Sequence, residues 1–135
     1  MAETAAATAR TPGAKRAGNG EFLFDLAKVN HILGGPAYST ANGACIEGDR
    51  MIVALMRMPA GTGAAEHSHP NEQWIYILEG TFRGKVAGKE FEAKPGSVLY
   101  VPANALHSGT ATADGDVVFF TVKDASHSLH GIKAG

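Results

Sequence analysis

The sequence has little of several residue types that would point to particular classes of protein. Its 135 residues contain one cysteine, Cys45, so the chain can form neither an internal disulfide nor a zinc site built on cysteines. The 12 basic and 13 acidic residues give a net charge of −1 and form no run of one sign, which argues against a nucleic-acid-binding surface. No apolar run approaches the roughly 18 residues of a membrane-spanning helix. We therefore expect a single cytoplasmic domain that binds neither nucleic acid nor membrane.

The N-terminal segment differs in composition from the rest of the chain. MAETAAATARTPGAKRAGNG is rich in Ala, Thr and Gly, and it lacks the apolar block of a signal peptide. We expect residues 1–20 to form a flexible tail, which a partner subunit could order. Residues 21–135 are then the folded domain.

Beyond the tail, short β-strands alternate with turns. The strand-length apolar runs are residues 22–29, 51–58, 73–78, 82–88, 90–94, 97–101, 105–110 and 116–123. Turn sequences such as AGKE (87–90) and KPGS (94–97) separate them at spacings of about 8–12 residues, which is typical of an antiparallel sandwich or barrel. One short helix is expected near residues 27–33, where Gly34-Gly35-Pro36 would end it.

Two of these runs, MIVALMRM (51–58) and DVVFFTVK (116–123), are apolar on both faces. One face can fill the interior of a barrel. The other face must then be covered, and a second subunit is the simplest cover. The sequence therefore predicts a homodimer.

The stretch EHSHPNEQWIYILEG (66–80) gathers the polar residues that suggest a site. Alternate residues of a strand point to the same face, so His67 and His69 share one face. Pro70 ends that strand, and the following turn can bring Gln73 back beside the two imidazoles. The residues expected to share the inward face of Gln73 are Ile75 and Ile77, and those expected outside are Trp74, Tyr76 and Leu78.

A third histidine, His107, follows a strand that ends at Pro102 and a turn at 102–104. The returning strand can place it opposite the first pair. An H-x-H pair alone is more often two polar residues on a solvated strand face, but Gly80 sits where a hairpin needs a positive φ, and a Pro95-Gly96 turn precedes His107. Three imidazoles and one amide oxygen suit a borderline divalent ion such as Zn, Ni, Fe, Mn or Co.

These residues fit two motifs of the cupin superfamily. The first reads G-x5-H-x-H-x3,4-E-x6-G and is matched by Gly61, His67, His69, Gln73 and Gly80. The second runs through a PG turn to a histidine and is matched by KPGSVLYVPANALH, which ends at His107. Over about residues 50–123 the sequence thus resembles the cupins.

The resemblance implies an all-β, single-domain fold, the antiparallel double-stranded β-helix (jelly-roll or cupin barrel). It also implies one divalent metal ion per chain (Fe, Zn, Ni or Mn), with His67, His69, Gln73 and His107 as its ligands. Gln73 stands where most cupins carry a glutamate. Glu72 is one alternative, but it lies too close to His69 for the motif, and parity counted from Gly80 favours Gln73. A site without a fourth protein ligand is the other alternative.

The glutamine matters physically, because four neutral ligands leave the charge of the ion uncompensated by the protein. This raises its Lewis acidity and favours an anionic oxygen ligand such as an enolate or carboxylate. A weakly held amide oxygen could also leave and open a position for substrate.

The strings HSHP and EQ are most similar to the small pectin-degradation cupins, which linearise unsaturated uronates. In those proteins an aspartate and an arginine on and after the last strand serve the sugar, whereas this region here reads VVFFTVKDASHS. We therefore expect an apolar substrate pocket beside the metal. Its expected members are Met56, Arg57, Tyr100 and Phe119, with Ile52, Met58, Ile75 and Val98 as further candidates, although apolar residues at such positions are more often ordinary core.

Three functions remain open. The first is a metalloenzyme acting on a small enolisable or aromatic compound, with dioxygenase chemistry if the metal is Fe(II). The second is non-redox isomerisation or ring opening of a sugar acid, with Tyr76, Tyr100 or Asp124 moving protons. The third is a non-catalytic module whose metal only presents a pocket for a small molecule.

Overall fold

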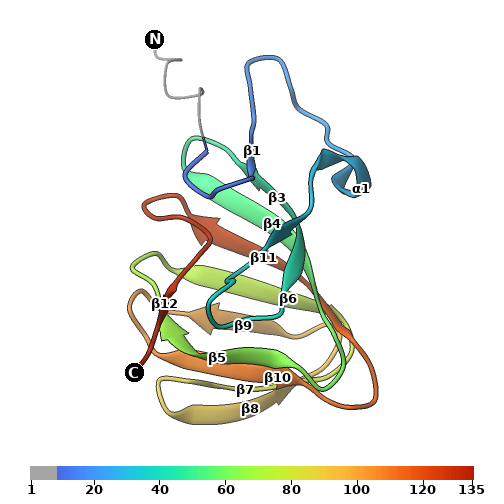
Figure 1. Ribbon diagram of the computed structural model, residues 1–135, viewed down its shortest axis with the longest axis vertical. Helices are drawn as coiled ribbons and strands as arrows, with labels where there is room; N and C mark the ends of the chain where they lie inside the picture. Colours follow the sequence, from blue (N-terminus) through green and yellow to red (C-terminus); the bar gives the residue numbers. More distant parts are fainter. Residues whose placement is uncertain (1–8) are drawn as a thin grey trace.

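The computed structural model describes residues 9–135, and in them short strands follow one another almost without helix (Figure 1). The elements in chain order are β1 (Lys15–Arg16), α1 (Leu26–Val29), β2 (Ile32–Leu33), β3 (Asn42–Glu47), β4 (Met51–Met58), β5 (Gly63–Ser68), β6 (Gln73–Glu79), β7 (Phe82–Val86), β8 (Lys89–Ala93), β9 (Val98–Val101), β10 (His107–Ala111), β11 (Val117–Asp124) and β12 (Ile132–Lys133). No helix among the described residues is long and apolar enough to cross a membrane.

The strands form two facing sheets. One has the order β1-β3-β4-β11-β6-β9, with β2 added beside β3, and the other has the order β12-β5-β10-β7-β8. All neighbouring strands are antiparallel except β1 and β3. Strands distant in sequence, such as β4 and β11, therefore lie side by side. This is the antiparallel jelly-roll that the sequence predicts.

The interior is filled by alternate residues of the long strands. In β4 the even-numbered residues are buried, and in β11 the odd-numbered ones are. Their register places Phe119 opposite Met56, so that the two sequences fill the same layer of the core. The core residues of these two strands are Ile52, Ala54, Met56, Met58, Val117 and Phe119.

Strand β6 faces as the alternation of its residues predicts. Gln73 and Ile77 are buried and Ile75 is half-buried, whereas Trp74, Tyr76 and Leu78 are exposed. The exposed aromatic rings continue onto β9, where Tyr100 packs on Trp74 with ring centroids 4.6 Å apart. This outer face of the seven-stranded sheet is the surface that the predicted homodimer would cover.

Two expectations about the N-terminal third need correction, and one strand there was not expected. Residues 22–29 do not form a strand: Asp25 caps the single turn of α1 instead, and Phe22 and Leu23 are 90% and 95% exposed. The helix is shorter than residues 27–33. A strand that was not predicted, β3, lies beside β4.

The segment expected to be a flexible tail, residues 1–20, is attached to the barrel over much of its described part. The backbone NH groups of Arg10 and Thr11 donate to the buried carboxylate of Glu47, at 2.7 and 2.9 Å. Strand β1 then pairs in parallel with the end of β3. Residues 1–8 of the expected tail lie outside the described residues.

Gly80 and Gly88 have almost the same backbone conformation but different surroundings. Comparing alanine substitutions at the two positions therefore isolates the cost of the close approach at Gly80. Gly80 has φ +81° and Gly88 has φ +82°; a Cβ on Gly80 would lie 2.2 Å from the carbonyl oxygen of Asp116, whereas a Cβ on Gly88 would meet nothing within 4 Å. Gly88→Ala should therefore cost only the left-handed conformation, roughly 1–2 kcal/mol. Gly80→Ala should cost about 3 kcal/mol or more, because the backbone must also move.

Denaturant unfolding of both variants checks this expectation. Equal losses in the free energy of unfolding would show that the close approach of Gly80 to Asp116 carries no strain.

Candidate metal centre

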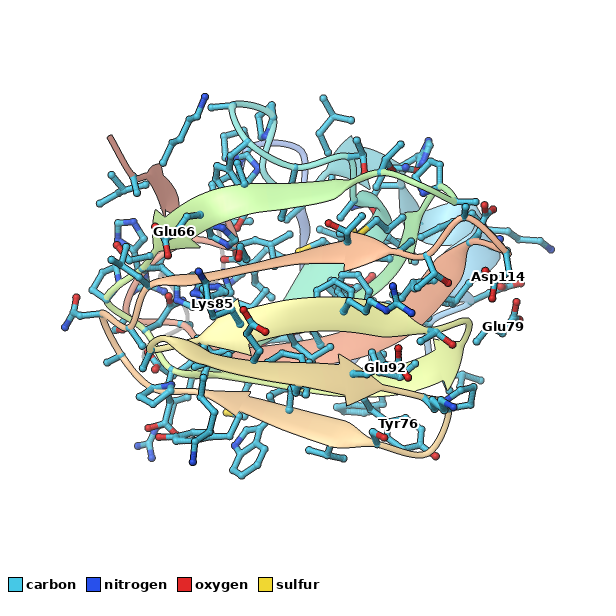
Figure 2. All side chains as sticks on the ribbon, turned by 90° about the horizontal axis from the view of Figure 1, so that it is seen from below. Glu66, Tyr76, Glu79, Lys85, Glu92 and Asp114 are labelled. Carbon is cyan, nitrogen blue, oxygen red and sulfur yellow. The ribbon has the colours of Figure 1, made fainter. Side chains whose placement is uncertain are left out.

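The three motif histidines converge at one end of the barrel interior. His67 on β5 lies directly opposite His107 on β10, and a register shift between His107 and Gly109 bends β10 there. His69 lies just past the end of β5, and Gln73 begins β6 on the other sheet. The neighbour of His67, Glu66, is exposed on the outer side of β5 (Figure 2). Strand alternation thus turns the imidazoles inward, as predicted.

The four side chains are close enough to share one ion. The ligand atoms of His67, His69 and His107 all lie within 4.8 Å of one another. Gln73 Oε1 is 3.0 Å from His69 Nε2. All four residues are buried, with exposures of 1–7%. Glu72, the alternative to Gln73, is exposed.

Hydrogen bonds fix which nitrogen of each imidazole is free. Nδ1 faces a backbone carbonyl oxygen in every case: Ala65 for His67 at 2.7 Å, Asn71 for His69 at 2.7 Å and Ala105 for His107 at 2.9 Å. A carbonyl can only accept, so Nδ1 carries the hydrogen and Nε2 of the neutral ring keeps its lone pair. Three lone pairs therefore point into one small space.

Burial keeps these rings neutral. Burial and the neighbouring His107 lower the pKa of His67 to about 3. Burial and the charge of Lys123 lower the pKa of His69 to about 4. The pKa of His107 is lowered by the same two causes. At neutral pH the contact between His69 Nε2 and Gln73 Oε1 then joins two acceptors, and a cation bound by both atoms would remove their repulsion. The donor set therefore fits a divalent metal ion.

A cavity of about 80 Å³ adjoins this cluster. His67, Gln73 and His107 line it, and most of the remaining lining is apolar, including Met56, Met58, Ile75, Phe82, Leu99 and Phe119. Met56 and Phe119 thus lie where the sequence predicts them. Ile52 and Val98, two further candidates, do not line the cavity.

Arg57 and Tyr100 were expected in the pocket and lie outside it. Arg57 falls between two inward-facing residues of β4, so it points outward and pairs with Asp116 at 2.9 Å. Tyr100 stands opposite Trp74 across the β6–β9 pair and shares its outward direction. Tyr76 is also outside, as Figure 2 shows.

Sequence reasoning missed several residues of the site. Tyr38 stacks on His67, with ring centroids 4.0 Å apart, and its hydroxyl accepts from the NH of Gly131 at 2.7 Å. Thr121 and Lys123 reach the cavity from β11. The alternation that placed Phe119 inside would have found both of them. Tyr38 lies in an irregular segment, where no periodicity marks it.

Lys123 is unusual because it is a lysine with only 3% of its surface exposed. Burial lowers its pKa to about 7. Its Nζ donates to the carbonyl oxygen of Leu129. Of the described residues that line the cavity, it is the only Lys, Arg, Asp or Glu.

The C-terminal segment closes the barrel over the site. Leu129 is buried against the cavity, and its NH donates to Thr11 Oγ1 at 2.8 Å. Asn71 Nδ2 lies within hydrogen-bonding distance of the carbonyls of Asp124, His127 and Ser128. Strand β12 then pairs with β5 beside His67 (Figure 1). The side chains of His127, His130 and His31 do not belong to the cluster.

A two-sheet β-barrel with inward histidines on neighbouring strands defines a class of small barrel proteins with a candidate metal site. Within that class, the chain belongs to the cupin family: the cupin-domain profile matches residues 54–123, about half of the sequence. A search of curated proteins finds no match.

Solved structures share the fold. The polyketide cyclase RemF from Streptomyces resistomycificus is 18% identical, with 78% of this chain and 80% of that chain covered and a TM-score of 0.68. An RmlC-like cupin from Shewanella frigidimarina is 16% identical, with 65% and 78% covered and a TM-score of 0.59. KdgF from Halomonas sp. is 18% identical, with 58% and 71% covered and a TM-score of 0.54.

Removal of one imidazole should empty the centre without unfolding the protein, since the apolar strands hold the barrel. We expect His107→Ala to weaken Zn²⁺ binding by more than the roughly 10–100-fold that loss of an outer-sphere partner costs. Metal analysis after dialysis and a circular dichroism spectrum test this. His31→Ala, at an exposed histidine outside the cluster, is the matched control. A variant that unfolds, or one that keeps its metal, contradicts the assignment.

The lowered histidine pKa values also predict how acid affects the metal-free protein. Unfolded histidines take up protons near pH 6.5, whereas His67 and His69 resist protonation until about pH 4 or below. Their contribution to stability is complete above pH 6.5 and is lost as pH falls towards 4. Between pH 6.5 and 5, above the range of ordinary carboxylates, the free energy of unfolding should already decrease. The free energy of unfolding can be measured with urea at several pH values. If it does not change between pH 6.5 and 5, the lowered pKa values of His67 and His69 are contradicted.

Proposed function

We propose that this cupin is a divalent-metal enzyme that binds a small enolisable or aromatic compound as its anion, with dioxygenase-type chemistry when the metal is Fe(II). One observation carries the proposal: a cluster of four uncharged ligand groups, three of which line an apolar cavity, lies beside a buried lysine that lines the same cavity. His67, His69 and His107 would hold the ion, and Gln73 would be the fourth, exchangeable ligand.

The charge balance of the site favours an anion. When bound, the metal would supply a positive charge that lowers the pKa of an enolic or phenolic hydroxyl in contact with it. No carboxylate among the described lining residues opposes that charge. Lys123, when protonated, adds to it from β11. The protein therefore stabilises the deprotonated form of a bound substrate.

The lining selects the rest of the substrate. Met56, Met58 and Phe119 present apolar atoms to the cavity, and they would leave the hydroxyl groups of a sugar without partners. The cavity of about 80 Å³ is smaller than the ~150 Å³ that holds a benzene ring. An aromatic substrate therefore has to displace a covering residue, and Leu129 and Tyr38 belong to irregular segments of the lining.

Oxygen uptake tests the proposed chemistry. Protein reconstituted with Fe(II) under anaerobic conditions should consume oxygen when a β-diketone or catechol from a panel is added. The Zn²⁺ protein and Fe(II)-loaded His107→Ala should not. No uptake with any member of the panel would reject the dioxygenase reaction.

Ring opening of a sugar acid is a second candidate, and Lys123 is the observation that favours it. A carboxylate of a uronate needs a cation, and Lys123 offers one beside the ligand cluster. KdgF, a structural relative, is 18% identical. The Zn²⁺ or Ni²⁺ protein would then remove the ultraviolet absorbance of an unsaturated galacturonate. If neither reaction occurs while ligands still bind, the chain is a binding module.

We further propose that the chain forms a homodimer through the outer face of the seven-stranded sheet. The exposed apolar side chains there are Trp74, Tyr76, Leu78, Val98 and Tyr100, a set too large for an ordinary solvated sheet face. Sedimentation equilibrium at low micromolar concentration should give twice the chain mass. A monomer under these conditions would refute the dimer.

A further inference from the structure

Gln73 is held by a chain of hydrogen bonds that fixes the direction of its amide. Gln73 Nε2 donates to Thr121 Oγ1 at 2.8 Å, and the Thr121 hydroxyl donates in turn to the backbone oxygen of Trp74, also at 2.8 Å. Both side chains are buried, with exposures of 7% and 1%. With Nε2 bound to Thr121, Gln73 Oε1 faces His69 Nε2 and the interior of the cluster.

The hydroxyl of Thr121 has a single hydrogen, which it gives to Trp74. Its oxygen can therefore only accept from the side chain at position 73. An amide supplies the required NH. A carboxylate of almost the same shape supplies only acceptors, so its second oxygen would face a lone pair of Thr121, or would take the Thr121 hydrogen away from the Trp74 carbonyl.

We propose that Thr121 is a positioning residue that turns the Gln73 amide oxygen towards the three imidazoles and makes position 73 select an amide over a carboxylate. This inference rests on the proposed metal site. Thr121, which is not itself a ligand, would thus keep the set of ligand side chains uncharged. Through that neutrality, Thr121 contributes to the preference of the site for an anionic substrate.

A double-mutant cycle on metal affinity tests the proposal. The four proteins are wild type, Gln73→Glu, Thr121→Val and the double variant, and each is titrated with Co²⁺ or Zn²⁺ in a calorimeter. Gln73→Glu adds a negative charge and should strengthen binding in either background. The increase in metal affinity caused by Gln73→Glu should be at least tenfold larger in the Thr121→Val background. There no threonine oxygen faces the introduced carboxylate, and the Gln73 amide has lost the acceptor that orients it.

Thr121→Ser supplies the matched control because it keeps the hydroxyl. In the Thr121→Ser background the effect of Gln73→Glu should equal that in wild type within twofold. Should Thr121→Val fail to fold, Thr121→Ala completes the cycle in its place. Two results would overturn the proposal. One is that Gln73→Glu changes the metal affinity by the same factor, within twofold, in all backgrounds; the other is that this factor rises tenfold in the Thr121→Ser background.

The readout separates this inference from the proposed reaction. Affinity cycles need no turnover, so a protein that binds metal with the expected coupling but consumes no oxygen would refute only the dioxygenase chemistry. A coupling near zero in a protein that does consume oxygen would refute only the role of Thr121. A wild-type protein that binds neither Co²⁺ nor Zn²⁺ would overturn the inference together with the metal site.

Discussion

The centre of this barrel depends on three short hydrogen bonds between imidazoles and the backbone. Ala65, Asn71 and Ala105 each lie two residues from the histidine that they hold, so the local chain fixes every ring without help from a distant element. Each bond places the hydrogen on Nδ1 and turns Nε2 inward. Because burial also keeps the rings neutral, the fold concentrates lone pairs at one point. A bound divalent cation would balance it.

The surroundings of this point are organised around the same requirement. Acidic side chains are absent from the described lining, and the one amide of the set is oriented by Thr121. The carboxylate of the buried Glu47 accepts instead from the NH groups of Arg10 and Thr11. Negative charge near the ion would thus have to come from the substrate. An apolar cavity beside a site of this kind suits a compound that becomes an anion only when it is bound.

Much of the fold and the clustering of the four candidate ligands follow from the sequence, since both rest on the two-residue period of strands and on turn chemistry. Gln73, Ile75 and Ile77 could be placed inside from parity alone. The prediction was wrong for Arg57 and Tyr100 because the alternation of inward and outward residues along their strands was not applied to them. It missed Tyr38 because this residue lies in an irregular segment, which has no such alternation. Strand β3, with the sequence NGACIE, has few residues of high β-propensity and forms because β4 and β2 flank it. Conversely, Phe22 and Leu23 have strand character but find no partner strand.

The positions of the four proposed ligands have a mechanical consequence. His67 and His107 belong to the five-stranded sheet, Gln73 begins a strand of the seven-stranded sheet, and His69 lies in the connection between them. An ion bound by all four would cross-link the two sheets, as a disulfide bond does in other small domains. At a thousandfold excess over its dissociation constant it would add about 4 kcal/mol to the folded state. The concentration of available metal would then set the stability of this end of the barrel as well as its activity.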